Sequence, residues 1–142
     1  TEPANSGSSV RDAEIPARTA AFRRIVLDAY DYRCAATGWR VLIPGGTTLI
    51  EAAHIVPFSE SFDDNPRNGM ALTPTFHEAL DRNLIAPGPD LKWHVSPLFD
   101  RRIPDFRAFV ELEGQQVIYE GDPSYAPARS NLEHRLAMLR KE

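Results

Sequence analysis

Three side chains suited to proton transfer and metal binding lie close together in the middle of the sequence. His54 ends a β-rich segment, Asn68 lies in the polar loop that follows, and His77 lies early in a predicted helix. Imidazole, with an ordinary pKa of about 6.5, accepts a proton near neutral pH. In its neutral form it also binds divalent cations. The trio therefore indicates proton transfer beside a bound cation. The alternatives are a buried structural His54 and an ordinary helix-start histidine at position 77.

A strand and a loop are predicted to carry the first two of these residues. Residues 47–55 are rich in strand formers, so His54 would have a rigid mounting at a strand end. A polar loop over 59–68 follows, and an apolar run resumes at 70–72. Asn68 precedes Gly69, and Asn-Gly is a common tight-turn pair. A turn is therefore the alternative to a site role for Asn68.

A helix is predicted to carry His77. Thr73 and Pro74 have the residue types preferred at the N-cap and at the first helical position. The helix would extend to about Arg82, with an apolar side made of Phe76, Ala79 and Leu80. Strand, loop and helix together place the two histidines on facing elements.

The flanking segments predict an α+β domain around this unit. Apolar residues recur at helical spacing over 18–33, and a last helix is predicted over 131–141. Short strands are predicted at 39–43, 84–86, 91–95 and 116–119. Residues 1–16 are small and polar without an apolar period, which predicts a linker or a disordered lead-in.

The ordered motifs resemble those of the HNH endonucleases. Residues 52–57 read AAHIVP, residues 68–72 read NGMAL, and residues 77–81 read HEALD. The turn at 34–38 (CAATG) and the closing LEHR at 132–135 are similar to one branch of the same family. The likeness extends over roughly residues 20–140, with its specific part in 51–81.

This resemblance implies a fold and a set of roles. The fold would be a ββα-metal core within 47–86, flanked by an N-terminal helix, short extra strands and a C-terminal helix, in a domain over 17–142. His54 would be the general base and His77 a metal ligand. Asn68 would brace the loop. The products would be a 5′-phosphate and a 3′-hydroxyl.

The sequence departs from the family pattern immediately before His54. Many HNH enzymes have a second metal ligand there, whereas Ala53 cannot coordinate a cation. Asp81, four residues after His77, shares its helix face and is one replacement. Glu51 is the other, about 6.6–6.8 Å from Ala53 along the same strand face. Such a mixed donor set admits one Mg²⁺, Mn²⁺, Ni²⁺ or Zn²⁺ ion, and the choice among them stays open.

DNA is the expected partner, held mainly through its phosphates. The arginines proposed as contacts are Arg67, Arg82, Arg23 and Arg24. A solvated surface explains each of them equally well. The net charge of −4, with the acidic excess in residues 59–90, argues against tight nonspecific binding by this chain alone. We therefore expect a reader domain in the same parent chain, and we leave a homodimer open.

Composition narrows the class of protein. The 142 residues suit one domain, and the sequence has no apolar run near the 20 or so residues of a membrane helix. The single Cys34 excludes an internal disulfide framework and is expected to be a small buried residue. A soluble protein of a reducing compartment, the cytoplasm, is the expectation.

The sequence leaves three hypotheses about function. The leading hypothesis is a metal-dependent DNA endonuclease, the effector domain of a bacterial restriction or defence protein. A catalytically weak nucleic-acid-binding or structural ββα domain is the second, favoured by Ala53. A toxin-type nonspecific nuclease is the third, and the acidic balance of the chain argues against it.

Overall fold

The computed structural model describes residues 9–142, with side chains described from residue 19 onward. Its helices and strands are α1 (Ser9–Ala29), β1 (Leu42–Ile43), β2 (Thr47–Thr48), β3 (Glu51–His54), α2 (Phe58–Ser61), β4 (Gly69–Leu72), α3 (Pro74–Asp81), β5 (Ile85–Pro87), β6 (Trp93–Val95), α4 (Arg107–Val110) and α5 (Arg129–Ala137). This content confirms the predicted mixture of helix and strand. In the described part of the chain, none of the helices combines the length and apolar character that crossing a membrane requires.

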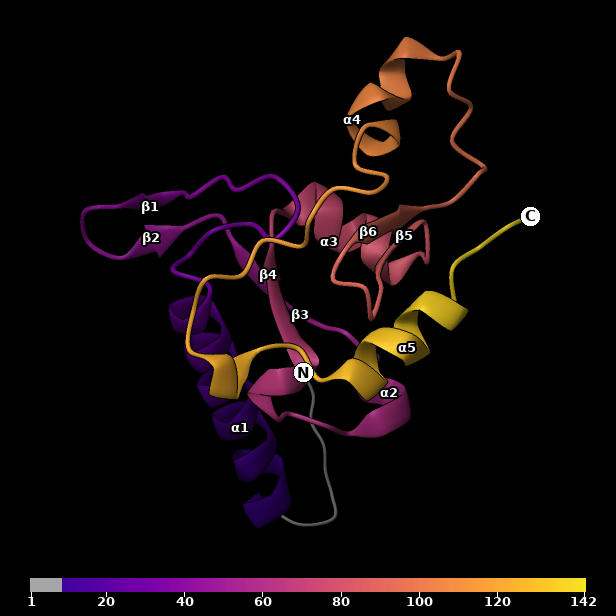
Figure 1. Cartoon of the computed structure of the whole chain (residues 1–142). Coiled ribbons are helices and arrows are strands. Elements are labelled where there is room, and N and C mark those ends of the chain that lie inside the picture. Colours follow the sequence, from indigo (N-terminus) through magenta and orange to yellow (C-terminus); the bar gives the residue numbers. More distant parts are fainter. Residues whose placement is uncertain (1–8) are drawn as a thin grey trace.

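The β3–β4 hairpin lies at the centre of the molecule, with α1 beside it (Figure 1). The strands are antiparallel, with Glu51 opposite Leu72 and His54 opposite Gly69. Both α1 and α3 pack against the two strands. Because side chains alternate along a strand, Glu51 and His54, three residues apart, point to opposite faces of the hairpin. Each face therefore carries one candidate site residue.

The α1 side of the hairpin is packed so closely that Gly69 has no room for a side chain. A Cβ atom there would lie 2.4 Å from Cγ2 of Val26 and 2.9 Å from Cζ of Phe22. Both neighbours are buried core residues of α1. The φ angle of Gly69 is −123°, which any residue adopts. Space therefore requires this glycine, and the Asn-Gly pair marks the start of β4 instead of a tight turn.

Helix α3 confirms the start and end predicted for it. Pro74 occupies the first turn, and Thr73 is the N-cap residue, although its side chain makes no capping hydrogen bond. The Thr73 hydroxyl instead accepts from the Cys34 thiol, with 3.8 Å between Oγ1 and Sγ. Cys34 is buried, as expected. The predicted apolar side is buried as well, and its members are Phe76, Ala79 and Leu80.

The bounds predicted for the first helix were wrong at both ends. It begins at Ser9 instead of Arg18, so residues 9–16 of the predicted linker are helical. Once nucleated, a helix extends at low cost, and polar residues disfavour burial without disfavouring helix. Residues 1–8 lie outside the described residues, so the linker prediction stays untested there. The helix ends at Ala29 instead of near Arg33.

For the other elements, the predicted type is more often correct than the predicted length. β1, β5 and β6 fall within or overlap predicted strands, and β5 pairs with β6. The strand predicted at 116–119 was wrong, because Gln116 makes only an isolated bridge to Lys92. The loop predicted at 59–68 is partly helical, since it overlaps α2 and contains a 3-10 turn at Pro66–Asn68. Helix α5 ends at Ala137, before the predicted residue 141.

Candidate functional site

His54 lies at the end of β3 among aromatic and acidic side chains. Its Nε2 lies 2.9 Å from Oδ1 of Asp64, and the two side chains are 21% and 18% exposed. The Phe22 ring stacks on the imidazole in parallel, with 4.1 Å between the ring centroids. The Phe58 ring lies 5.3 Å away at a tilt. The imidazole is thus held on a face and on an edge while part of it remains accessible.

The pairing with Asp64 determines which ring nitrogen of His54 carries the proton. An ionised carboxylate only accepts hydrogen bonds, so Nε2 must be the donor. In the neutral imidazole the lone pair is then on Nδ1. A carboxylate partner of this kind fixes both the tautomer and the orientation of the ring. Nδ1 is therefore the atom of His54 that can accept a proton.

Asn68 is fully buried and holds the loop between β3 and β4. Its Oδ1 accepts from the Val56 N–H at 2.8 Å. Its Nδ2 donates to the carbonyls of Val56 and Asp63, at 3.0 and 3.1 Å. Asp63 directly precedes Asp64, so these bonds fix the loop where it reaches His54. This is the arrangement of a bracing residue, the role expected for Asn68.

A buried arginine from α5 holds the end of β3. Arg135 is 1% exposed. Its Nε donates to the Ile55 carbonyl at 2.6 Å, and its Nη2 lies 3.4 Å from the His54 carbonyl. Its Nη1 donates to the Leu80 carbonyl at 3.1 Å and to Oδ1 of Asn83 at 2.7 Å. One side chain therefore joins the strand end that bears His54 to the last turn of α3.

Two opposing effects act on the pKa of Arg135. Burial lowers the pKa of this guanidinium, while the negative charges of Asp81 and Glu60 act in the opposite direction. Arginine nevertheless stays protonated in proteins. A fixed positive charge therefore lies between the two elements that carry His54 and His77.

His77 forms a second cluster with both carboxylates considered as metal ligands. Its Nδ1 lies 2.7 Å from Oε1 of Glu51, and its Nε2 lies 3.4 Å from Oδ2 of Asp81. The three side chains are 24%, 48% and 54% exposed, in the order His77, Glu51, Asp81. The structure therefore brings the predicted trio together. Because the two ring nitrogens point apart, the carboxylates lie on opposite edges of the ring.

The two clusters remain separate. No hydrogen bond or ion pair between described side chains joins the His54–Asp64 pair to the His77 cluster. Within the same residues, no three or more His, Cys, Asp or Glu side chains are arranged to hold a metal ion. Ala53 is fully buried, so the position before His54 adds no donor. A cation at His77 would therefore have few protein ligands.

Comparison with known proteins places these features in a family. Residues 34–86 match the family model described as HNH endonuclease. This segment belongs to the HNH endonuclease family. The chain is also similar in structure to a modification-dependent TagI restriction endonuclease, with a TM-score of 0.64 and 18% sequence identity. The similarity covers 84% of this chain and 38% of the other, and at this identity it shows a shared fold. No curated protein sequence matches the chain.

The four arginines proposed to contact DNA are all exposed, but two have partners within the protein. Arg67 donates from Nε to the Ala126 carbonyl at 2.9 Å. Arg82 pairs with Glu78, with 2.5 Å between Nε and Oε2. The others are Arg23 and Arg24 on α1. A contact with DNA stays a prediction for each of the four.

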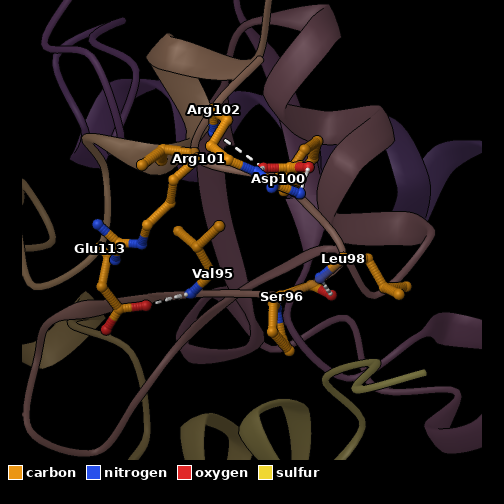
Figure 2. Close-up of a pocket in the computed structure, with 10 residues that line it drawn as sticks. Val95, Ser96, Leu98, Asp100, Arg101, Arg102 and Glu113 are labelled. Atoms are coloured by element: carbon orange, nitrogen blue, oxygen red, sulfur yellow. Dashed lines mark hydrogen bonds and ion pairs between the residues drawn. The ribbon is translucent and has the colours of Figure 1, made fainter. Parts of the chain in front are cut away.

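A pocket of about 670 Å³ lies away from the two histidine clusters. Figure 2 shows it with Asp100, Arg101 and Arg102 on one side and Val95 and Ser96 on the other. Asp100 and Arg102 form a two-pronged ion pair with each other. The lining includes none of the predicted site residues. The HNH domain thus presents its histidine clusters outside this concavity.

Sequence reasoning missed two residues of the site. Asp64 lies ten residues after His54, in the loop that ends at Asn68, so a carboxylate in that loop was an available signal. Arg135 lies 81 residues after His54 and outside the segment that matches the HNH family. Nothing near Arg135 in the sequence points to His54, and only the packing of α5 reveals the contact.

Proposed function

We propose that this HNH domain is a metal-dependent DNA endonuclease that hydrolyses phosphodiester bonds. The observation that carries the proposal is the His54–Asp64 pair, in which a carboxylate orients a partly exposed imidazole. Hydrolysis needs a base for the attacking water, and Nδ1 of His54 is the nitrogen left to accept that proton. By family analogy, the products would be a 5′-phosphate and a 3′-hydroxyl.

We infer that His77 and Asp81 would hold one divalent cation with two protein donors. Imidazole and carboxylate donors suit Mg²⁺, Mn²⁺, Ni²⁺ or Zn²⁺. The distance of 3.4 Å between Nε2 of His77 and Oδ2 of Asp81 exceeds an ordinary hydrogen bond, so these atoms are not committed to each other. Glu51 pairs with Nδ1 and so orients the ring. When bound, the cation would offset negative charge on the phosphate and on the leaving oxygen.

His77 and Asp81 are therefore assigned as the ligands, with Glu51 as the residue that orients His77. Both carboxylates were candidates to replace the ligand missing at Ala53, and the imidazole geometry separates their roles. The nitrogen of His77 that binds the cation must carry no proton. Nδ1 carries the proton instead and donates it in a hydrogen bond to Oε1 of Glu51. Arg135 keeps α3 in register with the end of β3 through its bonds to both. The proposal thus assigns the base to the end of β3 and the two cation ligands to α3.

DNA is the proposed substrate, and a defence role is the proposed context. Exposed arginines such as Arg67 and Arg23 offer phosphate contacts without reading sequence. The restriction endonuclease of similar structure is much longer than the matched region, which covers 38% of it. This supports a parent chain in which a reader domain directs cleavage. We place that protein in the bacterial cytoplasm and leave dimerisation open.

A second candidate is a ββα domain that binds nucleic acid with little or no catalysis. The observations that favour it are the buried Ala53 and the lack of a three-donor group among the described side chains. This candidate predicts DNA binding without cleavage. It also predicts that cations leave binding unchanged.

Plasmid nicking by the purified chain tests the proposal. The reactions contain EDTA or one of Mg²⁺, Mn²⁺, Ni²⁺ and Zn²⁺, and calorimetry measures cation affinity in parallel. We expect nicking only with a cation, a loss of at least about 100-fold in His77→Ala, and a larger loss in Asp81→Asn than in Glu51→Gln. The matched control is Glu78→Gln, which changes an α3 carboxylate that pairs with Arg82.

Each result has a defined reading. Nicking that persists in EDTA would contradict the metal requirement. Equal activity of His77→Ala and the control would contradict the ligand assignment. A folded chain that binds DNA but cleaves it with no cation would favour the second candidate.

A further inference from the structure

Phe62 is a large apolar side chain exposed beside the proposed general base. It is 73% exposed and ends helix α2 with φ 53° and ψ 29°. This left-handed conformation is usual for glycine or asparagine at a helix end and uncommon for a bulky residue. Both the exposure and the backbone conformation disfavour phenylalanine here. Such a combination of exposure and backbone strain points to a function at the surface.

A series of rings connects Phe62 to His54. The Phe62 and Phe58 rings make a T-shaped contact with 5.5 Å between the centroids, and Phe58 lies 5.3 Å from the His54 imidazole. The far face of His54 is covered by Phe22. Phe62 thus contacts Phe58, and Phe58 lies beside the proposed base His54. Phe62 is the exposed end of this series of rings. Nucleotides flanking a phosphate presented to His54 would lie within its reach.

The acidic residues around Phe62 disfavour a phosphate contact by this side chain. Residues 58–65 read FSESFDDN and include no basic side chain. Glu60 pairs with His134 at 3.2 Å, and Asp64 pairs with His54. The carboxylate of Asp63 accepts from the Asn65 backbone. A neutral, flat partner suits an exposed ring in this acidic loop, and the nucleobase is the part of DNA that fits.

We propose that Phe62 stacks on a nucleobase beside the scissile phosphate, an inference that rests on the proposed nuclease function. The base must expose a face, so the favoured substrate is DNA that is single-stranded or locally opened at the cut. Phe62 would then select the form of the substrate, while His54 and His77 carry out the chemistry. A contact with another protein is the competing use of an exposed phenylalanine, and the test separates the two.

The test compares two oligonucleotides with equal backbone charge. One is a fluorescein-labelled oligothymidine, and the other has the same length with abasic deoxyribose at every position. Fluorescence anisotropy measures the affinity of the wild-type chain, Phe62→Ala and Phe62→Trp for each. The control is Trp39→Ala, which removes another exposed aromatic ring. Nicking by each protein is measured on the same preparations.

We expect the wild-type chain and Phe62→Trp to prefer oligothymidine by about fivefold or more. Phe62→Ala should lose that preference and bind the abasic strand as the wild type does. Trp39→Ala should bind both strands as the wild type does. The salt dependence of binding should be the same in all four proteins, because no phosphate contact is removed.

Other results overturn the inference. An unchanged preference in Phe62→Ala, or an equal loss on both strands, would exclude base stacking. A change of oligomeric state in Phe62→Ala, measured by sedimentation, would assign Phe62 to a protein interface. If the wild type nicks DNA and any of these holds, only this inference fails. If the wild type neither nicks nor binds DNA, the proposed function fails with it.

Discussion

Two histidine–aspartate pairs in this molecule have nearly the same distance between nitrogen and oxygen. The distance from Nε2 to Oδ1 is 2.9 Å between His54 and Asp64 and 3.1 Å between His94 and Asp90. Their exposure differs, since the Asp64 side chain is 18% exposed and the Asp90 side chain 48%. The bond between a histidine and an aspartate therefore does not by itself distinguish a site from a surface pair.

The surroundings make the difference. His94 and Asp90 are four residues apart, and Asp90 also accepts from the Lys92 backbone, as residues of a turn do. His54 instead lies against Phe22 of α1, and its carbonyl lies against Arg135 of α5. Elements distant in sequence thus fix the orientation of one imidazole and leave the other to its own turn. Orientation by distant elements is what a general base requires.

The largest expected effect comes from removing His54, with His94 as the comparison. His54→Ala should lower the nicking rate by about 100- to 10,000-fold, because a positioned base contributes that much to proton transfer. His94→Ala should leave the rate within about twofold of wild type. Initial rates on supercoiled plasmid under the cation found most active measure both. Equal rates for the two variants would remove the distinction between the pairs.

Arg135→Met tests whether the buried arginine at the end of β3 positions His54. In the described part of the chain, the His94 pair has no such contact. The variant removes the Arg135 donor from the buried Ile55 carbonyl, while the Leu80 carbonyl keeps the Asn83 N–H. The free energy of unfolding should fall by about 2–5 kcal/mol, as measured by urea denaturation. Nicking at a temperature where the variant is still folded should fall by at least about tenfold.

The matched control for that prediction is Arg129→Met, also on α5. Arg129 is exposed and pairs with Glu133 at 3.2 Å, so its loss should cost less than about 1 kcal/mol. A folded Arg135→Met protein with wild-type stability and activity would show that packing alone positions His54.

The two aspartates give the smallest effects and sharpen the comparison further. Asp64→Asn should lower nicking by about 10- to 100-fold, because the amide no longer assigns the proton to Nε2 of His54. Asp90→Asn should leave nicking unchanged. A similar loss in both variants would indicate a general charge effect instead of an oriented pair.

The pH dependence of stability gives a further expectation for Asp90→Asn. The hydrogen bond from His94 lowers the pKa of Asp90, which is exposed. An acid with a lowered folded pKa stabilises the protein above its ordinary pKa of about 3.9 and loses that effect as pH falls through the folded value. Asp90→Asn should therefore cost less than about 1 kcal/mol near pH 6, and the cost should vanish in acid. Urea denaturation at several pH values measures this.

Local signals in the sequence were sufficient for part of the fold and site. Thr73 and Pro74 define the start of α3, and the spacing from His77 to Asp81 places both on one helix face. The contacts that orient His54 could not be predicted in this way. Phe22 and Arg135 reach it through the packing of helices far away in the chain. Periodicity and capping report on neighbours within a few turns, whereas such packing depends on the whole fold.

Gly69 has a consequence for how variants of this protein would be interpreted. It lies directly opposite His54 in the hairpin, and an added methyl group would collide with Val26 and Phe22. Phe22 could then no longer lie flat against the imidazole. In a library of single substitutions, alanine at position 69 would rank with the catalytic replacements, although no polar group is altered. The glycine here reflects the short distance between α1 and β4, and it is required neither for chemistry nor for a turn.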